Sequence, residues 1–513
     1  MSAHDILIMV TIIVYLGAML VVGIIYSKKT SSVSDFYLGG RSLGPIVTAM
    51  SAEASDMSAY LLMGIPGVAV LSGLAEAGWT AIGLALGTYL NWILVAKRLR
   101  NYSHHIKAIT VPEFFSKRYH DDKHIISFIA SIIIVVFFVP YTASGFNACG
   151  TLFSTLFGFD YFPAMVVSAV VLVAYTTMGG FLAASLTDLV QSIVMTAALV
   201  IVVIYGIHTA GGLDAVFQNA QSLPGYLSLD HIYDYTTGTA NVFTPLTIAS
   251  LLAWGLGYFG MPHVLLRFMA IENPNKLKAS RRIACSWVVI SMFIAIGIGF
   301  IGKAMIANSS LAELASEDSQ RIIIKISTLL SNEGVLATLL AGVIFSGILA
   351  ATMSTADSQL LAASSSISED IAKDFFGIKL TEKKRMLIAR LTIIAIAIVA
   401  IFWARNEGTV FYIVSFAWAG FGATFGPLMI LALFWKRGNK YGALAGLITG
   451  GAMVFIWKYL IAPLGGIFDI YELLPAFILA LIVNIVVSLA TGKPDAEVEK
   501  AFEEVKVINK LKA

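Results

Sequence analysis

Long runs of apolar residues, separated by short polar segments, recur along almost the whole chain. A helix needs about 20 predominantly apolar residues to cross the hydrocarbon core of a bilayer, which is about 30 Å thick. The pattern predicts an all-α polytopic membrane protein with thirteen transmembrane helices, at residues 5–26, 44–74, 77–97, 122–149, 160–178, 183–208, 244–270, 284–307, 336–372, 384–405, 408–435, 441–462 and 471–491. The first run lacks a basic flank and a small-residue cleavage site, so we expect a retained anchor helix and no signal peptide.

Composition and charge distribution agree with a bilayer protein. Of the 513 residues, 58% are hydrophobic and 13% are charged, whereas soluble domains have about 25% charged residues. Basic residues gather in alternate loops, which predicts a multi-pass protein of the cell (plasma) membrane with an external N-terminus and a cytoplasmic C-terminus. The loops predicted to be cytoplasmic carry Lys28, Lys29 and Arg41, the basic residues of 97–123, 267–282, 373–390 and 436–440, and the lysines of the tail. The net charge of +3 therefore reflects topology, and we expect no nucleic-acid partner.

The sequence lacks the usual motifs of nucleotide or zinc chemistry. It contains no Walker A motif, no HExxH and no CxxC. The two cysteines, Cys149 and Cys285, are predicted near opposite membrane faces, which excludes a disulfide framework. The tail from residue 492 is too short for a catalytic or signalling domain. We therefore expect no enzyme, and we keep a membrane-embedded enzyme and a membrane nutrient sensor as alternatives from other classes.

Four acids interrupt the apolar segments: Glu53, Asp56, Asp188 and Asp357. A charged side chain at the centre of a membrane helix costs about 2.5 to 3.5 kcal/mol on insertion scales, so each acid is a functional candidate. The alternative is that an acid lies at a helix end, in the headgroup region. Glu53 and Asp56 belong to the stretch SAEASDMSAYLLMGIPG, residues 51–67, whose small residues, glycines and proline predict a broken helix. In transporters such breaks line a cavity and expose carbonyl groups that coordinate cations.

A second polar cluster lies in the segment 336–372. Ser354, Thr355 and Ser358 surround Asp357 within two helical turns. Carbonyl, hydroxyl and carboxylate oxygens suit a hard cation such as sodium. The alternative for each hydroxyl is a hydrogen bond to the backbone of its own helix.

Four segments carry a family resemblance: SAEASDMSAYLLMGIPG, GGFLAASLTDLVQ at 179–191, LLAWGLGYFGMPHVLLRFMA at 251–270 and AATMSTADSQLL at 350–361. They are similar, in order and spacing, to segments of the sodium/proline symporters of the solute:sodium symporter family. The resemblance implies two five-helix inverted repeats whose first helices are broken. It divides the chain into an N-terminal anchor helix and loop (1–43), a first repeat (44–208), an external loop (209–243), a second repeat (244–435), two further helices (436–491) and a cytoplasmic tail (492–513).

The resemblance also implies roles for individual residues. The sodium site would use the carbonyls of Ala54, Met57 and Ala351 and the hydroxyls of Ser354 and Thr355, with Asp56 as the acid needed for sodium coupling. A second cation site would use Asp188, Ser354, Asp357 and Ser358. The substrate would contact Ser58, Tyr141, Trp254, Tyr258 and Pro262. The last three repeat every four residues, which predicts one stripe on a helix.

The function implied by the resemblance is symport of sodium, the co-transported ion, with L-proline by alternating access, performed by a monomer in the lipid bilayer. The sequence departs from the family pattern at Glu53, Tyr60 and Met261, which border the proposed pocket. Another small neutral amino acid or a short monocarboxylate therefore remains an alternative substrate.

Overall fold

The computed structural model describes residues 2–28, 30, 32–406 and 408–511. Lys29 and residues 512–513, which belong to segments predicted to be cytoplasmic, lie outside the described part. Within it, eleven helical segments are long and apolar enough to cross a membrane, or twelve when one bent pair is counted as a span. The prediction of a helical polytopic membrane protein is confirmed, apart from one small β-hairpin.

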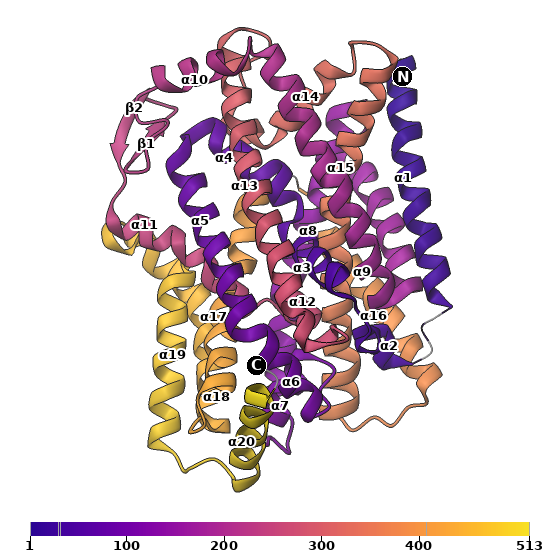
Figure 1. Cartoon of the computed structure of the whole chain (residues 1–513), viewed down its shortest axis with the longest axis vertical. Helices are drawn as coiled ribbons and strands as arrows, with labels where there is room; N and C mark the ends of the chain where they lie inside the picture. Colours follow the sequence, from indigo (N-terminus) through magenta and orange to yellow (C-terminus); the bar gives the residue numbers. More distant parts are fainter. Residues whose placement is uncertain (1, 29, 31, 407, 512–513) are drawn as a thin grey trace.

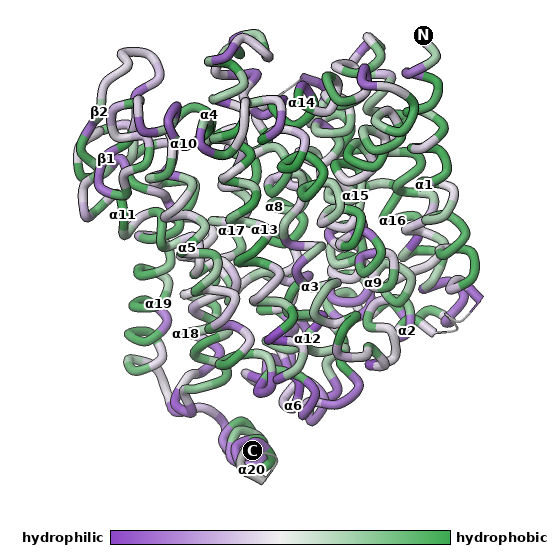
Figure 2. The backbone as a smooth tube through the Cα atoms, turned by 45° about the horizontal axis from the view of Figure 1, so that its top comes forward, coloured by the Kyte–Doolittle hydropathy of each residue, from purple (hydrophilic) through white to green (hydrophobic). Residues whose placement is uncertain are grey.

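The helices form a single bundle whose ends are polar (Figures 1 and 2). The first part of the chain forms α1 (Ala3–Ser27), α2 (Val33–Leu38), α3 (Pro45–Ala59), α4 (Ile65–Ser72), α5 (Leu74–Asn91), α6 (Lys97–His105), α7 (Val111–Arg118), α8 (Ile125–Phe157), α9 (Tyr161–Thr209) and α10 (Leu213–Ser222). A π-helical segment, Tyr60–Gly64, joins α3 to α4, and another, Trp92–Ala96, joins α5 to α6.

The second part begins with an antiparallel hairpin of β1 (His231–Asp234) and β2 (Thr239–Val242), in which His231 pairs with Val242. It continues with α11 (Pro245–Leu252), the 3-10 segment η4 (Ala253–Phe259), α12 (Pro262–Ala270), α13 (Leu277–Ala307), η6 (Ser316–Arg321), α14 (Ile322–Leu330), α15 (Val335–Ser365), the π-helical segment η7 (Ser366–Phe375), α16 (Glu382–Trp403), α17 (Val410–Phe434), α18 (Lys440–Ile456), α19 (Leu473–Ala490) and α20 (Ala496–Leu511).

Burial separates an inner set of helices from an outer one. In both Pro45–Ser72 and Val410–Phe434, 89% of the residues in an apolar stretch of 18 are buried. In the corresponding stretch of α1 the share is 28%. Helix α15 packs against α1, α3, α8 and α9. The exposed faces of the outer helices carry large apolar side chains, such as Val14 and Phe293, which suits contact with lipid. The acids of α3 and α15 therefore lie in the interior of the bundle, away from lipid.

Two spans are broken where their sequences predicted it. In the first, Ser58 has φ 47° and ψ −170°, which no helix contains. In the second, the 44° bend between η4 and α12 lies at Gly260 and Met261, and Met261 is extended. Proline stands at the first position of α12 because that position needs no backbone donor.

Helix α9 covers two of the predicted spans, 160–178 and 183–208. It has 49 residues, and a straight helix of this length would be about 74 Å long, more than twice the thickness of the hydrocarbon core. Gly180 interrupts it with φ 63° and ψ −162°. An added Cβ at Gly180 would lie 2.7 Å from the ring of Phe36, so both the backbone conformation and the packing favour glycine there.

Candidate functional site

The four acids found in the sequence are all in the bundle interior. Glu53, Asp188 and Asp357 have no exposed surface, and Asp56 is 5% exposed. All four lie within segments that are long and apolar enough to cross a membrane. Because a buried carboxylate needs compensation, the partners of these acids define the candidate site.

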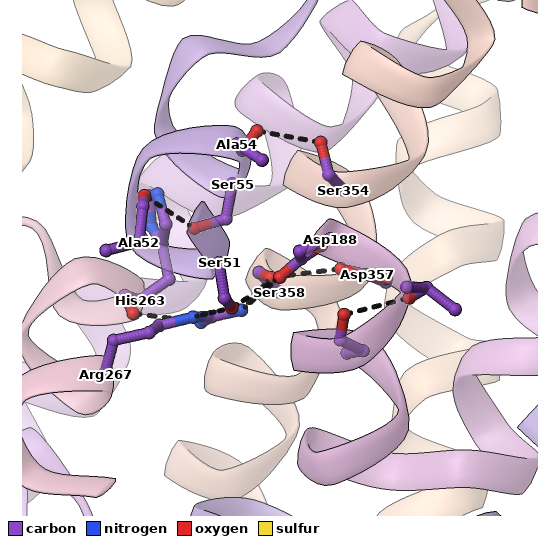
Figure 3. Close-up of polar contacts among 12 residues, drawn as sticks. Ser51, Ala52, Ala54, Ser55, Asp188, His263, Arg267, Ser354, Asp357 and Ser358 are labelled. Carbon is purple, nitrogen blue, oxygen red and sulfur yellow. Dashed lines mark hydrogen bonds and ion pairs between the residues drawn. The ribbon is translucent and has the colours of Figure 1, made fainter. Parts of the chain in front are cut away.

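The first group of partners joins α3 to α15 at the predicted sodium site. The Ser354 hydroxyl donates a hydrogen bond to the carbonyl of Ala54 (2.8 Å) and one to that of Ala351 (3.2 Å). The Thr355 hydroxyl also donates to the Ala351 carbonyl (3.2 Å). Four of the five residues predicted to hold sodium therefore lie together (Figure 3 shows Ala54 and Ser354). The fifth, Met57, lies beside the break, where its carbonyl accepts the backbone N–H of Tyr60.

The second group surrounds Asp56. The hydroxyl of Tyr258 donates to Asp56 Oδ2 (2.5 Å), and that of Tyr141 donates to the Asp56 carbonyl (3.3 Å). The other carboxylate oxygen, Oδ1, has no hydrogen-bond partner among the described residues. Ser58 is buried at the break, and its hydroxyl accepts the N–H of Tyr60 (3.1 Å). The carboxylate thus keeps one oxygen available in the interior.

A small cavity adjoins Asp56, and we call it the central cavity. It is lined by Asp56, Met57, Tyr60, Leu84, Tyr141, Trp254, Met292, Val414 and Trp418. Its volume is about 10 Å³, roughly the space of one water molecule. An amino acid would fit only after the lining side chains moved apart.

The third group centres on Arg267 (Figure 3). Its Nη2 lies 3.1 Å from Asp188 Oδ2, and its Nε donates to the Ser51 hydroxyl (3.0 Å). Nη2 also donates to the Ser358 hydroxyl, which in turn donates to Asp357 Oδ1 (3.0 Å). The predicted second group, Asp188, Asp357 and Ser358, is therefore brought together, but with an arginine among its members. Its fourth predicted member, Ser354, bonds to Ala54 instead.

The sequence analysis placed Arg267 in a cytoplasmic loop, and this is wrong. Arg267 is 1% exposed on α12, with Asp188 as its counter-charge. A buried arginine is tolerated when its hydrogen bonds and charge are matched. Hydropathy alone does not show that Arg267 is buried, because its partner Asp188 lies 79 residues away in the chain.

The comparisons with known proteins identify the family. The model of the Sodium:solute symporter family matches residues 36–450. The chain belongs to this family. The osmoregulated proline transporter OpuE of Bacillus subtilis is 41% identical over 489 residues, with 95% of each chain covered. The sodium/proline symporter of Haemophilus influenzae is 41% identical over 511 residues, with 97% of this chain and 99% of that one covered.

A solved structure supports the same fold for this sodium:solute symporter. A Na+-coupled sialic acid symporter, in a substrate-bound outward-open state, matches it with a TM-score of 0.78 over 95% of this chain and 99% of that chain. The two sequences are 20% identical, so this likeness concerns the fold alone.

One expectation for the substrate residues of this family member needs correction. Trp254, Tyr258 and Pro262 do not share one helical stripe, because the 3-10 segment ends at Phe259 and a new helix begins at Pro262. Trp254 and Tyr141 line the central cavity and Tyr258 bonds to Asp56, whereas Ser58, Tyr258 and Pro262 are not among the residues that line this small cavity.

The sequence analysis missed Trp418 on α17. Its indole N–H donates to the Trp254 carbonyl (2.8 Å), and its ring packs edge-on against Tyr258, 5.1 Å between centroids. The signal in the sequence was a tryptophan inside the glycine-rich segment 417–427 of an otherwise apolar span. On the facing segment η4, Gly257 allows the close approach, because a Cβ at that position would lie 1.9 Å from the indole nitrogen of Trp418.

Proposed function

We propose that this chain is a secondary active symporter that couples inward sodium flow to the uptake of L-proline by alternating access. The observation that carries this is the near full-length similarity to a proline transporter and a sodium/proline symporter. The cluster of Asp56, Tyr141 and Tyr258 beside an interrupted helix supports it, because such interruptions bind ions and substrate in transporters. The protein acts as a transporter and makes or breaks no bond.

Sodium binds between α3 and α15 in this proposal. The carbonyls of Ala54, Met57 and Ala351 and the hydroxyls of Ser354 and Thr355 coordinate the ion. The Ser354 hydroxyl points to the Ala54 carbonyl and the Thr355 hydroxyl to the Ala351 carbonyl, so each hydroxyl turns its proton aside when it offers a lone pair to the ion. The ion then bridges the two helices and stabilises the conformation that accepts substrate.

Proline binds in an expanded central cavity. Asp56, which keeps a free carboxylate oxygen, couples the ion to the substrate. Ser58, Tyr141, Trp254, Tyr258 and Pro262 contact the substrate, and Pro262 also starts the helix that follows the break. The rings of Tyr60 and Trp254 stack at 5.3 Å over the cavity, so they must separate when substrate enters.

A second cation binds beside Asp357. Asp188 and Asp357 carry two negative charges and Arg267 one positive charge, so a single positive charge remains to be supplied. Sodium or a proton, held by Asp357 and Ser358 near Asp188, brings the net charge of these side chains to zero. Ser354 belongs to the first site, since its hydroxyl points to Ala54.

The thirteen-helix arrangement is also part of the proposal. Counting the bent pair as one span and dividing α9 at Gly180 gives the thirteen predicted helices. The repeats extend over 44–208 and 244–435, and both begin with a broken span. The remaining parts are the anchor helix and loop (1–43), the external loop (209–243), the two further helices (436–491) and the tail (492–513).

The positive-inside rule orients the bundle with the N-terminus outside and the tail in the cytoplasm. The end of the bundle near α6 and α20, which Figure 2 colours as hydrophilic, is then cytoplasmic. The hairpin β1–β2 is external. We propose that the protein functions as a monomer in the plasma membrane.

The test is uptake of labelled L-proline into liposomes that contain only this protein. An inward sodium gradient with a negative interior should drive uptake. A potential of 100 mV and a tenfold sodium gradient together supply about 3.7 kcal/mol per ion, enough for roughly 500-fold accumulation. Equal uptake with potassium in place of sodium on both sides would refute sodium coupling, and sodium-driven uptake of other solutes without proline would refute the substrate.

A further inference from the structure

A larger cavity lies on the external side of the central one, and we call it the vestibule. Its volume is about 460 Å³, which is in the range of small-molecule sites. Glu76, Tyr233, Asp234, Glu317, Phe411 and Tyr412 are among its lining residues. They come from α5, β1, η6 and α17, at the end of the bundle that carries the β-hairpin (Figure 1). The proposed function does not use this cavity.

The charged residues that line the vestibule are all acids. They are Glu76, Asp234 and Glu317, and no Lys or Arg lines the cavity in the part of the chain that the structure describes. The hydroxyl and backbone N–H of Thr236 donate to Asp234 and hold the pKa of its carboxyl at about 2. Asp234 is therefore ionised at physiological pH. The vestibule attracts cations and offers no counter-charge to a carboxylate.

Aromatic rings complete the lining. Tyr233, Phe411 and Tyr412 are among them. The faces of such rings attract cations, and an organic ammonium group gains from the contact while its apolar carbons are also buried. Lys303 is not a lining residue, although its Nζ lies 5.5 Å from the centre of the Tyr233 ring. This combination of acids and rings suits a small organic ammonium better than a strongly hydrated metal ion.

One aromatic layer separates the vestibule from the central cavity. Phe411 lines the vestibule and stacks on Tyr60 (5.5 Å between centroids), and Tyr60 stacks on Trp254. Tyr60 and Trp254 line the central cavity. The Tyr60 hydroxyl is buried without a hydrogen-bond partner among the described residues, and both Glu76 and Asp56 contribute to its electrostatic surroundings. The two cavities thus share a partition of aromatic rings.

We propose that the vestibule is a second binding site, which holds the ammonium group of the amino-acid substrate before the substrate passes the layer of Tyr60, Trp254 and Phe411. This inference rests on the proposed function for the identity of that substrate. It assigns recognition of the positive end to Glu76 and Glu317 with the neighbouring rings. The carboxylate end finds no basic partner in the vestibule, so binding there is weak and substrate moves on.

The test uses pyrrolidinium, a five-membered ring with the ammonium group and without a carboxylate. Its binding to the full-length purified chain in detergent is measured by saturation-transfer NMR, with neutral tetrahydrofuran as the control for partition into micelles. We expect pyrrolidinium to bind and L-proline to compete. Loss of one charge–ammonium contact in Glu76→Gln should raise the dissociation constant about fivefold to tenfold.

Two further variants keep the test decisive. Glu317→Gln should shift the dissociation constant in the same direction, since Glu317 is an exposed lining residue and its replacement does not threaten folding. Glu333→Gln changes an exposed acid on the connection between α14 and α15 and should have no effect. Absent pyrrolidinium binding, or equal binding by all variants, overturns the inference. Glu76-dependent pyrrolidinium binding in a chain that takes up no proline refutes the proposed substrate and leaves the ammonium site standing.

Discussion

Replacing Arg267 by methionine should destabilise the bundle strongly. The change keeps an apolar stem and removes the guanidinium, which lies 3.1 Å from Asp188 Oδ2, with both side chains at most 1% exposed. Asp188 then keeps only the Ser51 hydroxyl (2.6 Å), because its Oδ1 has no partner among the described residues. Breaking a buried ion pair typically costs about 3–5 kcal/mol. The equilibrium between folded and unfolded forms should therefore shift by roughly 150-fold to 5,000-fold.

The measurement is unfolding of the purified protein in mixed micelles, followed by tryptophan fluorescence. The double variant Arg267→Met/Asp188→Leu removes both charges, and most of the lost stability should return because no uncompensated charge remains. Arg282→Met is the matched control. Arg282 is exposed on α13, so its loss should change the free energy of unfolding by at most about 0.5 kcal/mol.

Two outcomes would contradict this reasoning. One is a loss below about 1 kcal/mol in Arg267→Met, since such a value is typical of a solvent-exposed pair. The other is a double variant that loses as much stability as Arg267→Met and Asp188→Leu lose together when each is measured alone. That result would mean that the two charges do not interact.

Three further outcomes are expected. Thr355→Ala removes a proposed sodium ligand and should raise the sodium concentration for half-maximal uptake. Tyr258→Ala removes surface of the substrate pocket and should chiefly raise the KM for proline. Identical kinetic defects in the two variants would contradict separate ion and substrate sites. Asp357→Ser should change the sodium-to-proline ratio or the pH profile without altering substrate selectivity, and reversal potentials that match those of the native protein would exclude Asp357 from ion coupling. Gly255→Ala places a Cβ 2.2 Å from a carbonyl oxygen of α5 and should lower thermal stability by several degrees, whereas Gly17→Ala, with open space around it, should not.

Much of the fold follows from local sequence. The length of each apolar run predicts a span, and the described residues contain eleven to twelve helices that are long and apolar enough to cross a membrane. The break at Ser58 is predictable because small residues precede it and Gly64 and Pro66 follow. The oxygens of Ser354 and Thr355 are predictable as a polar group, because hydroxyls beside an acid stand out in an apolar span.

The partners of these groups depend on distant parts of the chain. Trp418 reaches Trp254 across 164 residues, and Arg267 reaches Ser358 across 91. Periodicity predicted one stripe for Trp254 and Pro262, but a non-helical residue between them turns the chain and separates them. A regular spacing identifies a shared face only where the helix is continuous.

The sequence by itself determined that the chain is a helical membrane protein, which apolar runs are long enough to cross a bilayer, and which polar residues must be compensated inside. This holds because the cost of placing a residue in hydrocarbon depends mainly on that residue and its immediate neighbours. Only the tertiary structure decided how each acid is compensated: Glu53 by Thr88 and Trp92, Asp56 by Tyr258, Asp188 by Arg267, and Asp357 by Tyr175 and Ser358. Hydrogen bonds and ion pairs act over about 3 Å, and packing of separate helices alone brings atoms to that distance.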